Sequence, residues 1–281
     1  MSSSRELLQK VAQRLQDAEI EQPFLEAQLL LSLALEAPRA SVLAGTTPLP
    51  TPDQAKAIER LLCEREKRVP FAYLRGNQEF YGLLFQVTPA VLIPRPETEL
   101  LVDFALERLV THPKPRFVEV GAGSGCISIT LLKHLPNAQA VATDISPAAL
   151  AIAQENARIH SVQDRLLLLH TNLLMGVCGE FDLLLSNPPY IPTEEIPTLQ
   201  QEVRDHEPHL ALDGGKEGVA LIRELLSQSR RNLSSEGWIA MEVAFGQATH
   251  VESLLVENGF QSVGSRRDLA GIPRLVYGQK P

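Results

Sequence analysis

The sequence predicts an α/β protein built on an open, doubly wound and mainly parallel sheet. From Arg116 onward, short apolar runs alternate with segments of helical periodicity, which is typical of β-α-β units. The 281 residues are enough for one large domain and a smaller companion, each with its own core. The predicted strands are FVEV (117–120), AVAT (140–143), LLLLH (166–170), DLLLS (182–186), WIAMEV (238–243), a segment near 261–263, and RLVYG (274–278).

The first third of the chain is predicted to be helical. Ser3 and Glu6 have the spacing of a capping box, which marks the start of a helix. A leucine-rich helix is expected over roughly 23–35. Thr51 precedes a proline, an N-cap followed by the first helical position, so a charged helix is expected over about 52–67.

A change of composition at residue 77 divides the chain. Aromatic and β-branched residues flank Gly82, which predicts a β-hairpin. We therefore expect three parts: an N-terminal helical domain over 1–76 that recognises substrate, a hairpin linker over 77–94, and a catalytic α/β domain over 95–281.

Composition and charge exclude several classes of protein. Hydrophobic residues make up 44% and charged residues 21% of the chain, as in ordinary globular proteins. The net charge of −8, without a long run of Lys and Arg, argues against affinity supplied by bare nucleic-acid phosphates. Cys63, Cys126 and Cys178 form no C-x-x-C pair, so neither a disulfide framework nor a zinc ligand set is predicted.

No targeting or membrane segment is expected. The N-terminus lacks an apolar signal core, and no apolar stretch approaches the roughly 18 residues needed to span a bilayer. These observations predict a soluble, cytoplasmic protein without membrane attachment.

A glycine loop, VEVGAGSGC, follows the first predicted strand and precedes a helix. Gly121, Gly123 and Gly125 allow the backbone to approach a ligand, although they also suit a plain tight turn. The third glycine of a nicotinamide fingerprint is replaced here by Cys126. Glu119 resembles the acid that S-adenosylmethionine (SAM) methyltransferases carry at the end of their first strand. An acid there suits the ammonium of SAM better than a pyrophosphate.

Two polar residues follow the next two predicted strands. Asp144 is placed to accept hydrogen bonds from both ribose hydroxyls, or to organise the helix that begins after Ser146. Asn172 occupies the position that holds adenine in such enzymes, and it is also a common turn residue. The predicted cofactor-binding residues are Glu119, Gly121, Ala122, Gly123, Ser124, Gly125, Asp144, Asn172 and Asn187.

The segment NPPY directly follows the leucine-rich fourth strand of the predicted sheet. In open α/β sheets the ligand crevice lies outside the carboxyl ends of the strands. The two prolines stiffen the segment, so the Asn187 side-chain carbonyl and the Pro188 backbone carbonyl can accept both hydrogens of a planar NH2 group. Tyr190 can stack on the group that carries it. We predict Asn187, Pro188 and Tyr190 as catalytic residues, and these three with Pro189 as substrate-binding residues; a rigid turn is the alternative.

The acceptor chemistry alone leaves glutamine, adenine and cytosine open. The chain, however, resembles the release factor glutamine methyltransferase family (the PrmC/HemK type) over nearly its whole length. The segments that carry the resemblance are VPFAYLRGNQEFYGLLFQV, VLIPRPETELLVD, VEVGAGSGCISI, SNPPYIP, EVRDHEPHLALDGGKEGVALIRELL and RRDLAGIPRLVYG.

This resemblance implies a Rossmann-like class I SAM methyltransferase domain with a seven-stranded sheet, one strand of which is antiparallel. It implies methyl transfer from SAM, with S-adenosylhomocysteine as the product, to the glutamine side-chain nitrogen of the Gly-Gly-Gln motif in peptide chain release factors. We expect a monomer that needs no nucleic acid. One departure is Asn172-Leu173, where many relatives have an acid followed by an aromatic residue.

Two alternative functions stay open at this point. One is an amino-methyltransferase acting on adenine or cytosine in nucleic acid, and the other is a non-catalytic SAM-binding adaptor of translation. No metal is expected, because His206 and His209, with Asp205 and Glu207, form only a weak H-x-x-H signal. Thr98, with its neighbour Glu97, either lines the cofactor mouth or caps the helix that begins there.

Overall fold

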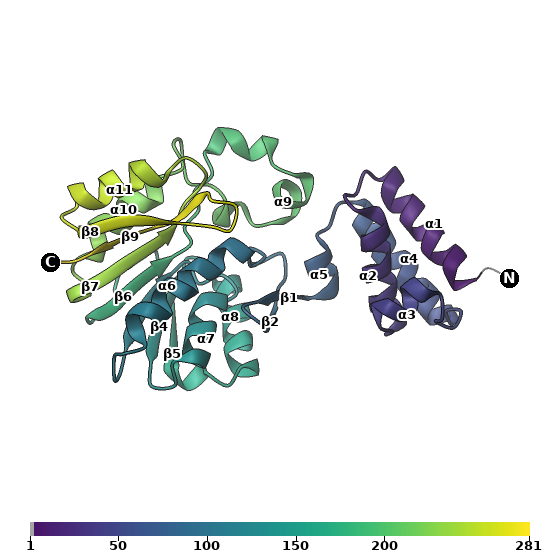
Figure 1. Cartoon of the computed structure of the whole chain (residues 1–281), viewed down its shortest axis with the longest axis horizontal. Coiled ribbons are helices and arrows are strands. Elements are labelled where there is room, and N and C mark those ends of the chain that lie inside the picture. The colour runs from purple at the N-terminus through teal and green to yellow at the C-terminus, as the bar shows by residue number, and fades with distance from the viewer. Residues whose placement is uncertain (1–2) are drawn as a thin grey trace. The chain divides into compact units, whose positions relative to one another are not determined.

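The computed structural model describes residues 3–281, which form two compact units (Figure 1). The first unit comprises the chain up to Gly76 together with Gln200–His206. The second comprises Asn77–Leu199 and Glu207–Pro281. The chain therefore passes from one unit to the other three times, and the predicted hairpin linker lies within the second unit.

The first unit is entirely helical within the described residues. The expected capping box of Ser3 and Glu6 is present, and the expected N-cap Thr51 proves to form a capping box as well, with Gln54. The leucine-rich helix has the predicted bounds, whereas three short helices were not predicted. The helices are α1 (Ser4–Asp17), α2 (Pro23–Leu35), α3 (Arg39–Ala44), α4 (Pro52–Glu66), α5 (Phe71–Arg75) and α9 (Gln201–His206).

One buried arginine joins three helices of this unit. Arg65 of α4 has a side chain only 6% exposed. Its Nε lies 3.1 Å from Glu26 Oε2 of α2, and its Nη2 lies 3.1 Å from Glu202 Oε1 of α9. Arg68 Nε also lies 3.2 Å from Glu202 Oε1. Two arginines and two glutamates thus balance each other's charge and fasten α9 to the helical unit.

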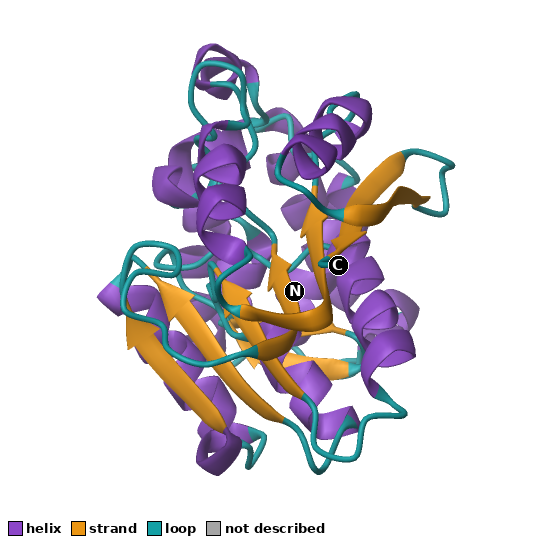
Figure 2. Cartoon of the chain, turned by 90° about the vertical axis from the view of Figure 1, so that its left-hand side faces the viewer, coloured by secondary structure: helices purple, strands orange, loops and turns teal. Residues whose placement is uncertain are grey.

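The second unit contains the predicted doubly wound sheet, whose strands Figure 2 shows in orange. Its order is β5-β4-β3-β6-β7-β9-β8, in which β9 runs antiparallel to both of its neighbours. The order reverses between β3 and β6, the adjacent strands at the topological switch point. The strands are β3 (Arg116–Val120), β4 (Gln139–Asp144), β5 (Leu166–His170), β6 (Phe181–Ser186), β7 (Leu233–Glu242), β8 (Gln261–Arg267) and β9 (Pro273–Gln279).

Helices cover both faces of this sheet, and alternate strand residues pack on opposite faces. Leu183 and Leu185 of β6 belong to the core beneath α6, α7 and α8, whereas Leu184 belongs to the core beneath α10 and α11. All three leucines are fully buried, as a strand covered on both faces requires. The helices are α6 (Glu99–Leu109), α7 (Cys126–His134), α8 (Pro147–Ile159), α10 (Ala220–Ser229) and α11 (Ala248–Glu257).

The expected hairpin forms between β1 (Asn77–Phe80) and β2 (Leu83–Gln86). Its two turn residues, Tyr81 and Gly82, have φ values of 51° and 73°, as a two-residue hairpin turn demands. Two strands are longer than expected: β8 continues to Arg267, and β7 begins at Leu233 and not at 238. Leu233 pairs with Phe181, and a register shift then separates this pair from the regular ladder. None of the described helices could cross a membrane.

The segment after β6 is held against a glycine-rich turn. Ile191 donates its backbone N–H to the Leu212 carbonyl and accepts from the Gly214 N–H, at 3.0 and 2.9 Å. A Cβ on Gly218, where φ is +69°, would lie 2.2 Å from the Tyr190 carbonyl oxygen. Glycine is therefore required at 218 both by its conformation and by the approach of the NPPY backbone.

We predict that Arg65→Met destabilises the first unit by about 1–3 kcal/mol, because the partly buried Glu26 loses its cationic partner, whereas Glu202 keeps Arg68. Denaturant unfolding, with hydrogen exchange to locate the loss in α2 and α4, would measure the effect. Arg158→Met is the matched control, since it breaks an Arg–Glu pair that is exposed. Equal stability of the two variants would show that the Arg65 pairs contribute nothing.

We also predict that Gly218→Ala is far more damaging than Gly82→Ala. Both glycines have positive φ, so each alanine costs about 1–2 kcal/mol of backbone strain. No heavy atom lies within 4 Å of a Cβ placed on Gly82, whereas at 218 backbone must move. Thermal unfolding of both variants would compare them. Similar melting temperatures would mean that the backbone of the NPPY segment can move away from residue 218 at little cost in stability.

Candidate active site

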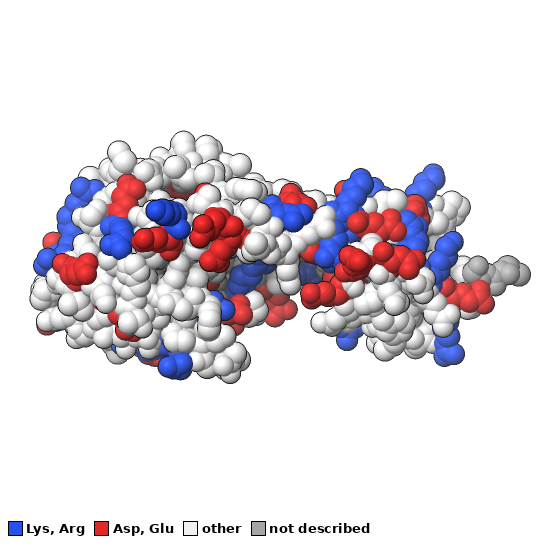
Figure 3. All heavy atoms as spheres, turned by 90° about the horizontal axis from the view of Figure 1, so that it is seen from above, with Lys and Arg blue, Asp and Glu red and all other residues white. Residues whose placement is uncertain are grey.

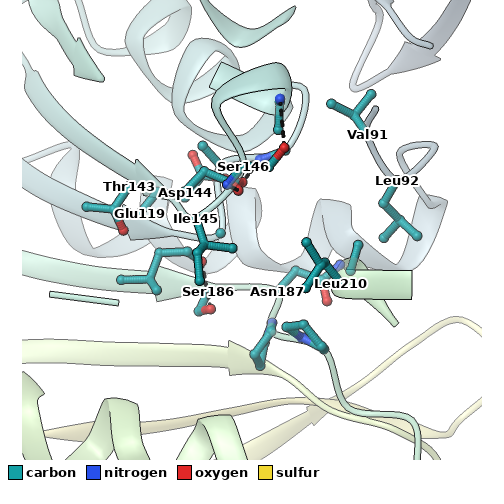
Figure 4. A pocket seen from close by; sticks show the side chains of 18 of the residues that line it. Val91, Leu92, Glu119, Thr143, Asp144, Ile145, Ser146, Ser186, Asn187 and Leu210 are labelled. Atoms are coloured by element: carbon teal, nitrogen blue, oxygen red, sulfur yellow. Dashed lines mark hydrogen bonds between the residues drawn. The ribbon is translucent and has the colours of Figure 1, made fainter. Parts of the chain in front are cut away.

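A pocket of about 410 Å³ opens at the carboxyl ends of β3, β4, β5 and β6 in the second unit. This is the position and the size expected of a small-molecule site in an open α/β sheet. Figure 4 shows Glu119, Asp144 and Asn187 around it, each from a different strand end. The predicted residues that line it are Glu119, Gly121, Ala122, Gly123, Ser124, Asp144, Asn172, Asn187, Pro188 and Pro189. Gly125 and Tyr190 are not among the lining residues.

The glycine loop has the conformation that only glycine adopts readily. Gly121, Gly123 and Gly125 have φ values of 81°, 53° and 78°. A Cβ on Gly125 would lie 2.9 Å from Ile129 of α7 and 3.3 Å from Ala153 of α8. Gly125 therefore permits close helix packing, whereas Gly121 and Gly123 face the pocket.

Glu119 is a buried acid with one unused acceptor. The residue is 1% exposed, and its Oε2 accepts hydrogen bonds from the Ser128 backbone N–H, at 3.0 Å, and from the Ser128 hydroxyl. Its Oε1 is buried without a hydrogen-bond partner among the described residues. Burial raises the pKa of Glu119 to about 8, although the Ser128 hydrogen bonds oppose the shift. Such an oxygen fits a cationic donor such as the ammonium of SAM.

Asp144 fastens two loops of the pocket. Its Oδ2 accepts from the Gly123 N–H at 2.9 Å, and its Oδ1 accepts from the Ser146 N–H at 2.8 Å. Ser146 is the expected N-cap of α8, with its hydroxyl accepting from the Ala149 N–H. The predicted role in organising this terminus is thus present. Each carboxylate oxygen has capacity for another donor, so ribose binding stays a prediction.

Asn172 and Leu173 line the pocket beyond β5. Leu173 has a φ of 49°, so the backbone turns sharply after Asn172. Ile145 and Leu173 supply apolar surface on this side. The predicted adenine contact of Asn172 remains a prediction.

Asn187 has its amide oriented by a buried hydroxyl. Its Nδ2 donates to Thr98 Oγ1 at 3.2 Å, and Thr98 in turn donates to Glu242 Oε2 at 2.6 Å. No donor among residues 3–281 hydrogen-bonds to Asn187 Oδ1. Thr98 lines the pocket, as one of the two sequence interpretations expected, whereas its side chain makes no capping hydrogen bond to α6 and Glu97 is not among the lining residues. This arrangement leaves a side-chain carbonyl for a ligand.

Tyr190 lies differently from what stacking on a ligand in the pocket would suggest. Its hydroxyl donates to Glu242 Oε1 at 3.1 Å, and burial raises the pKa of this phenol. Its backbone carbonyl accepts from Gln247 Nε2 at 2.9 Å. Stacking of Tyr190 on the acceptor stays a prediction. Sequence reasoning missed Glu242, although an acid that ends an apolar strand was the same signal that singled out Glu119.

The residues of the weak H-x-x-H signal, for which no metal was expected, make separate contacts in the structure. His206 Nε2 hydrogen-bonds the Lys67 carbonyl at 2.9 Å within the first unit. In the second unit, Glu207 accepts from the Ile93 N–H at 3.1 Å and pairs with Arg95. Residues 3–281 contain no group of three or more His, Cys, Asp or Glu that could hold a metal.

Two family descriptions match separate parts of the chain. The PrmC N-terminal domain matches residues 6–76, and the methyltransferase small domain matches residues 98–216.

Solved structures share the fold of the second unit. The hMettl16 catalytic domain in complex with the MAT2A 3′UTR hairpin 1 superimposes with a TM-score of 0.59 at 15% identity, covering 79% of this chain and 83% of that one. A methyltransferase from Pyrococcus furiosus gives 0.53 at 19% identity, covering 72% and 90%. At these identities the likeness concerns the fold alone, and it confirms the predicted fold class.

Proteins named release factor glutamine methyltransferase match nearly the whole chain. The one from Geobacter sulfurreducens is 40% identical over 92% of this chain and 90% of its own length. The one from Bradyrhizobium diazoefficiens is 39% identical over 96% and 92%. The family predicted from the motifs is confirmed: the chain belongs to the release factor glutamine methyltransferase family.

Proposed function

We propose that this protein transfers the methyl group of SAM to the side-chain amide nitrogen of the glutamine in the Gly-Gly-Gln motif of peptide chain release factors. The observation that carries the proposal is one pocket with two unused acceptors, Glu119 Oε1 and Asn187 Oδ1, at neighbouring strand ends. When bound, SAM supplies a methyl group on a sulfonium, which is electrophilic without a metal.

The chain holds SAM through the loops after β3, β4 and β5. Glu119 Oε1 accepts from the ammonium, and the backbone of Gly121 and Gly123 borders the amino-acid part of the ligand. Asp144 accepts from the ribose with the lone pairs that Gly123 and Ser146 leave available. Asn172 and Leu173 border the adenine.

The acceptor glutamine binds at the NPPY segment. Asn187 Oδ1 and the Pro188 backbone carbonyl accept the two hydrogens of its NH2 group, which aims the nitrogen lone pair at the methyl carbon. An amide nitrogen is a poor nucleophile, so this alignment is the main contribution of the chain to the rate. The nitrogen loses one proton when the N-methyl amide forms, and this proton passes to solvent water, because the two carbonyl oxygens accept hydrogen bonds but are too weakly basic to take the proton.

The remaining expectations are part of the same proposal: a cytoplasmic monomer that needs no nucleic acid, with residues 1–76 docking the release factor. On the face drawn in Figure 3, acidic and basic side chains are intermixed, and no extended basic surface appears there. A nucleic-acid amino-methyltransferase would draw affinity from such a surface.

Incubation with labelled SAM and a purified release factor, followed by mass mapping of the labelled peptide, tests the proposal. Label on the Gly-Gly-Gln glutamine is expected. Label on nucleic acid alone would instead support the amino-methyltransferase alternative, and binding of SAM without transfer to either would support the adaptor.

We predict that SAM binding at pH 7 releases about one proton. Glu119 is mostly protonated in the free protein, since its pKa is about 8, and an ammonium partner lowers that pKa. Between pH 6 and 7.5, affinity should therefore rise with pH, by at most about tenfold per unit. Titration calorimetry in two buffers of different ionisation enthalpy measures the release, and Glu119→Gln should abolish it. Identical heats in both buffers would contradict the role of Glu119.

We predict that Asn187→Ala lowers turnover by about 100-fold or more, because one of the two carbonyls that align the nitrogen is lost. The accompanying loss of SAM affinity should be smaller. Steady-state methylation of the release factor measures turnover, and calorimetry measures affinity. Asn232→Ala is the control, a buried asparagine whose Nδ2 donates to the Val177 carbonyl away from the pocket. Near wild-type turnover of Asn187→Ala would indicate that the NPPY segment is only a rigid turn.

A further inference from the structure

A second buried carboxylate of the sheet, Glu242, has no part in the function described so far. Glu242 is the last residue of β7 and is only 3% exposed. Burying an acid is costly unless its oxygens receive hydrogen bonds. Here both oxygens do: Oε2 accepts from Thr98 Oγ1 at 2.6 Å, and Oε1 accepts from the Tyr190 hydroxyl at 3.1 Å.

The Thr98 hydrogen bonds have a fixed direction. With Glu242 ionised, its two oxygens can only accept, so Thr98 gives its one hydrogen to Glu242. Its oxygen can then only accept from Asn187, which must turn its NH2 toward Thr98. The Asn187 amide is thereby fixed with Nδ2 toward Thr98, which leaves Oδ1 available to a ligand in the pocket.

The same carboxylate also holds the far end of the NPPY segment. Tyr190 is three residues beyond Asn187, and the two prolines between them stiffen the backbone. Glu242 thus contacts one end of the segment directly and the other end through Thr98. No other side chain among the described residues is hydrogen-bonded in this way to both ends.

We propose that Glu242 is a positioning residue that, through Thr98, presents the Asn187 side chain to the pocket as a hydrogen-bond acceptor and so selects an NH2-bearing acceptor side chain. This inference rests on the proposed function, because it concerns how the same site chooses glutamine. A carbonyl oxygen in this position accepts from an amide NH2 and repels a carboxylate oxygen. Glutamine is therefore bound, whereas glutamate in the same tripeptide is rejected.

Thr98→Val tests the inference most directly, because it keeps the shape of the side chain and removes the hydroxyl. Asn187 can then rotate its amide, so turnover should fall about 10- to 100-fold while SAM affinity changes less than about threefold. Thr98→Ser, which restores a hydroxyl, should recover most of the lost turnover. Thr130→Val is the matched control: Thr130 is also a buried threonine, but its hydroxyl has no partner and it does not line the pocket.

A mutant cycle separates positioning from general destabilisation. In the Asn187→Ala background, Thr98→Val should cause little further loss, because the side chain that Thr98 orients is gone. Glu242→Gln should keep part of its effect there, because it also disturbs the hydrogen bond to Tyr190. A Thr98→Val loss that multiplies with that of Asn187→Ala would overturn the proposal, and so would wild-type turnover of Thr98→Val.

A measurement without catalysis keeps this inference distinct from the proposed function. The side-chain NH2 signals of Asn187 in ¹⁵N-labelled protein, assigned by their absence in Asn187→Ala, should shift in Thr98→Val and return toward wild type in Thr98→Ser. If the wild-type protein labels no release factor, the proposed function fails, and these signals still decide the orientation of the amide. Unchanged signals in Thr98→Val would overturn the inference even in an active enzyme.

Discussion

A buried carboxylate must be given hydrogen-bond donors, and the loops of this active site are arranged around three such groups. β3, β4 and β7 each carry an acid at or next to their carboxyl end: Glu119, Asp144 and Glu242. The donors are the start of α7 for the first, the glycine loop and the start of α8 for the second, and Thr98 with Tyr190 for the third. The rigid sheet thereby sets the positions of loops that are far apart in sequence. Because these three strands are parallel, their carboxyl ends lie on the same side of the sheet, and all three acids are found there.

The three acids differ in how many of their oxygens receive hydrogen bonds from the protein, and this difference fits the roles proposed for them. Asp144 and Glu242 each give both oxygens to the protein itself. Glu119 keeps one oxygen unused. Burial raises the pKa of Glu119 and of Glu242 alike. In the roles proposed above, Glu119 keeps an acceptor for a cationic ligand, Glu242 only holds loops, and Asp144 does both, because its carboxylate has lone pairs beyond those given to Gly123 and Ser146.

Much of the fold was predictable because its signals are local. A few neighbouring residues suffice to recognise the capping box at Ser3, the N-cap at Thr51, the apolar strands and the glycine loop. The pairing of Thr98 with Glu242 spans 144 residues, and no local pattern encodes it. The membership of α9 in the first unit was also not predictable from local patterns, because it depends on the pairing of Arg65 with Glu202, which are far apart in sequence. The direction of the Tyr190 hydroxyl was likewise set by an acid from a distant strand.

The three crossings of the chain between its units bear on how the helical unit can be exchanged among relatives. A chimaera that takes residues 1–76 from another member of the family would keep the native Gln200–His206, which belongs to the same unit. Arg65 and Glu202 would then come from different parents, and a mismatch would leave charge unpaired in a largely buried place. The segment to be exchanged is therefore discontinuous in sequence. Residues 1–76 and Gln200–His206 must be transplanted together, and substitutions in one stretch limit those that the other tolerates.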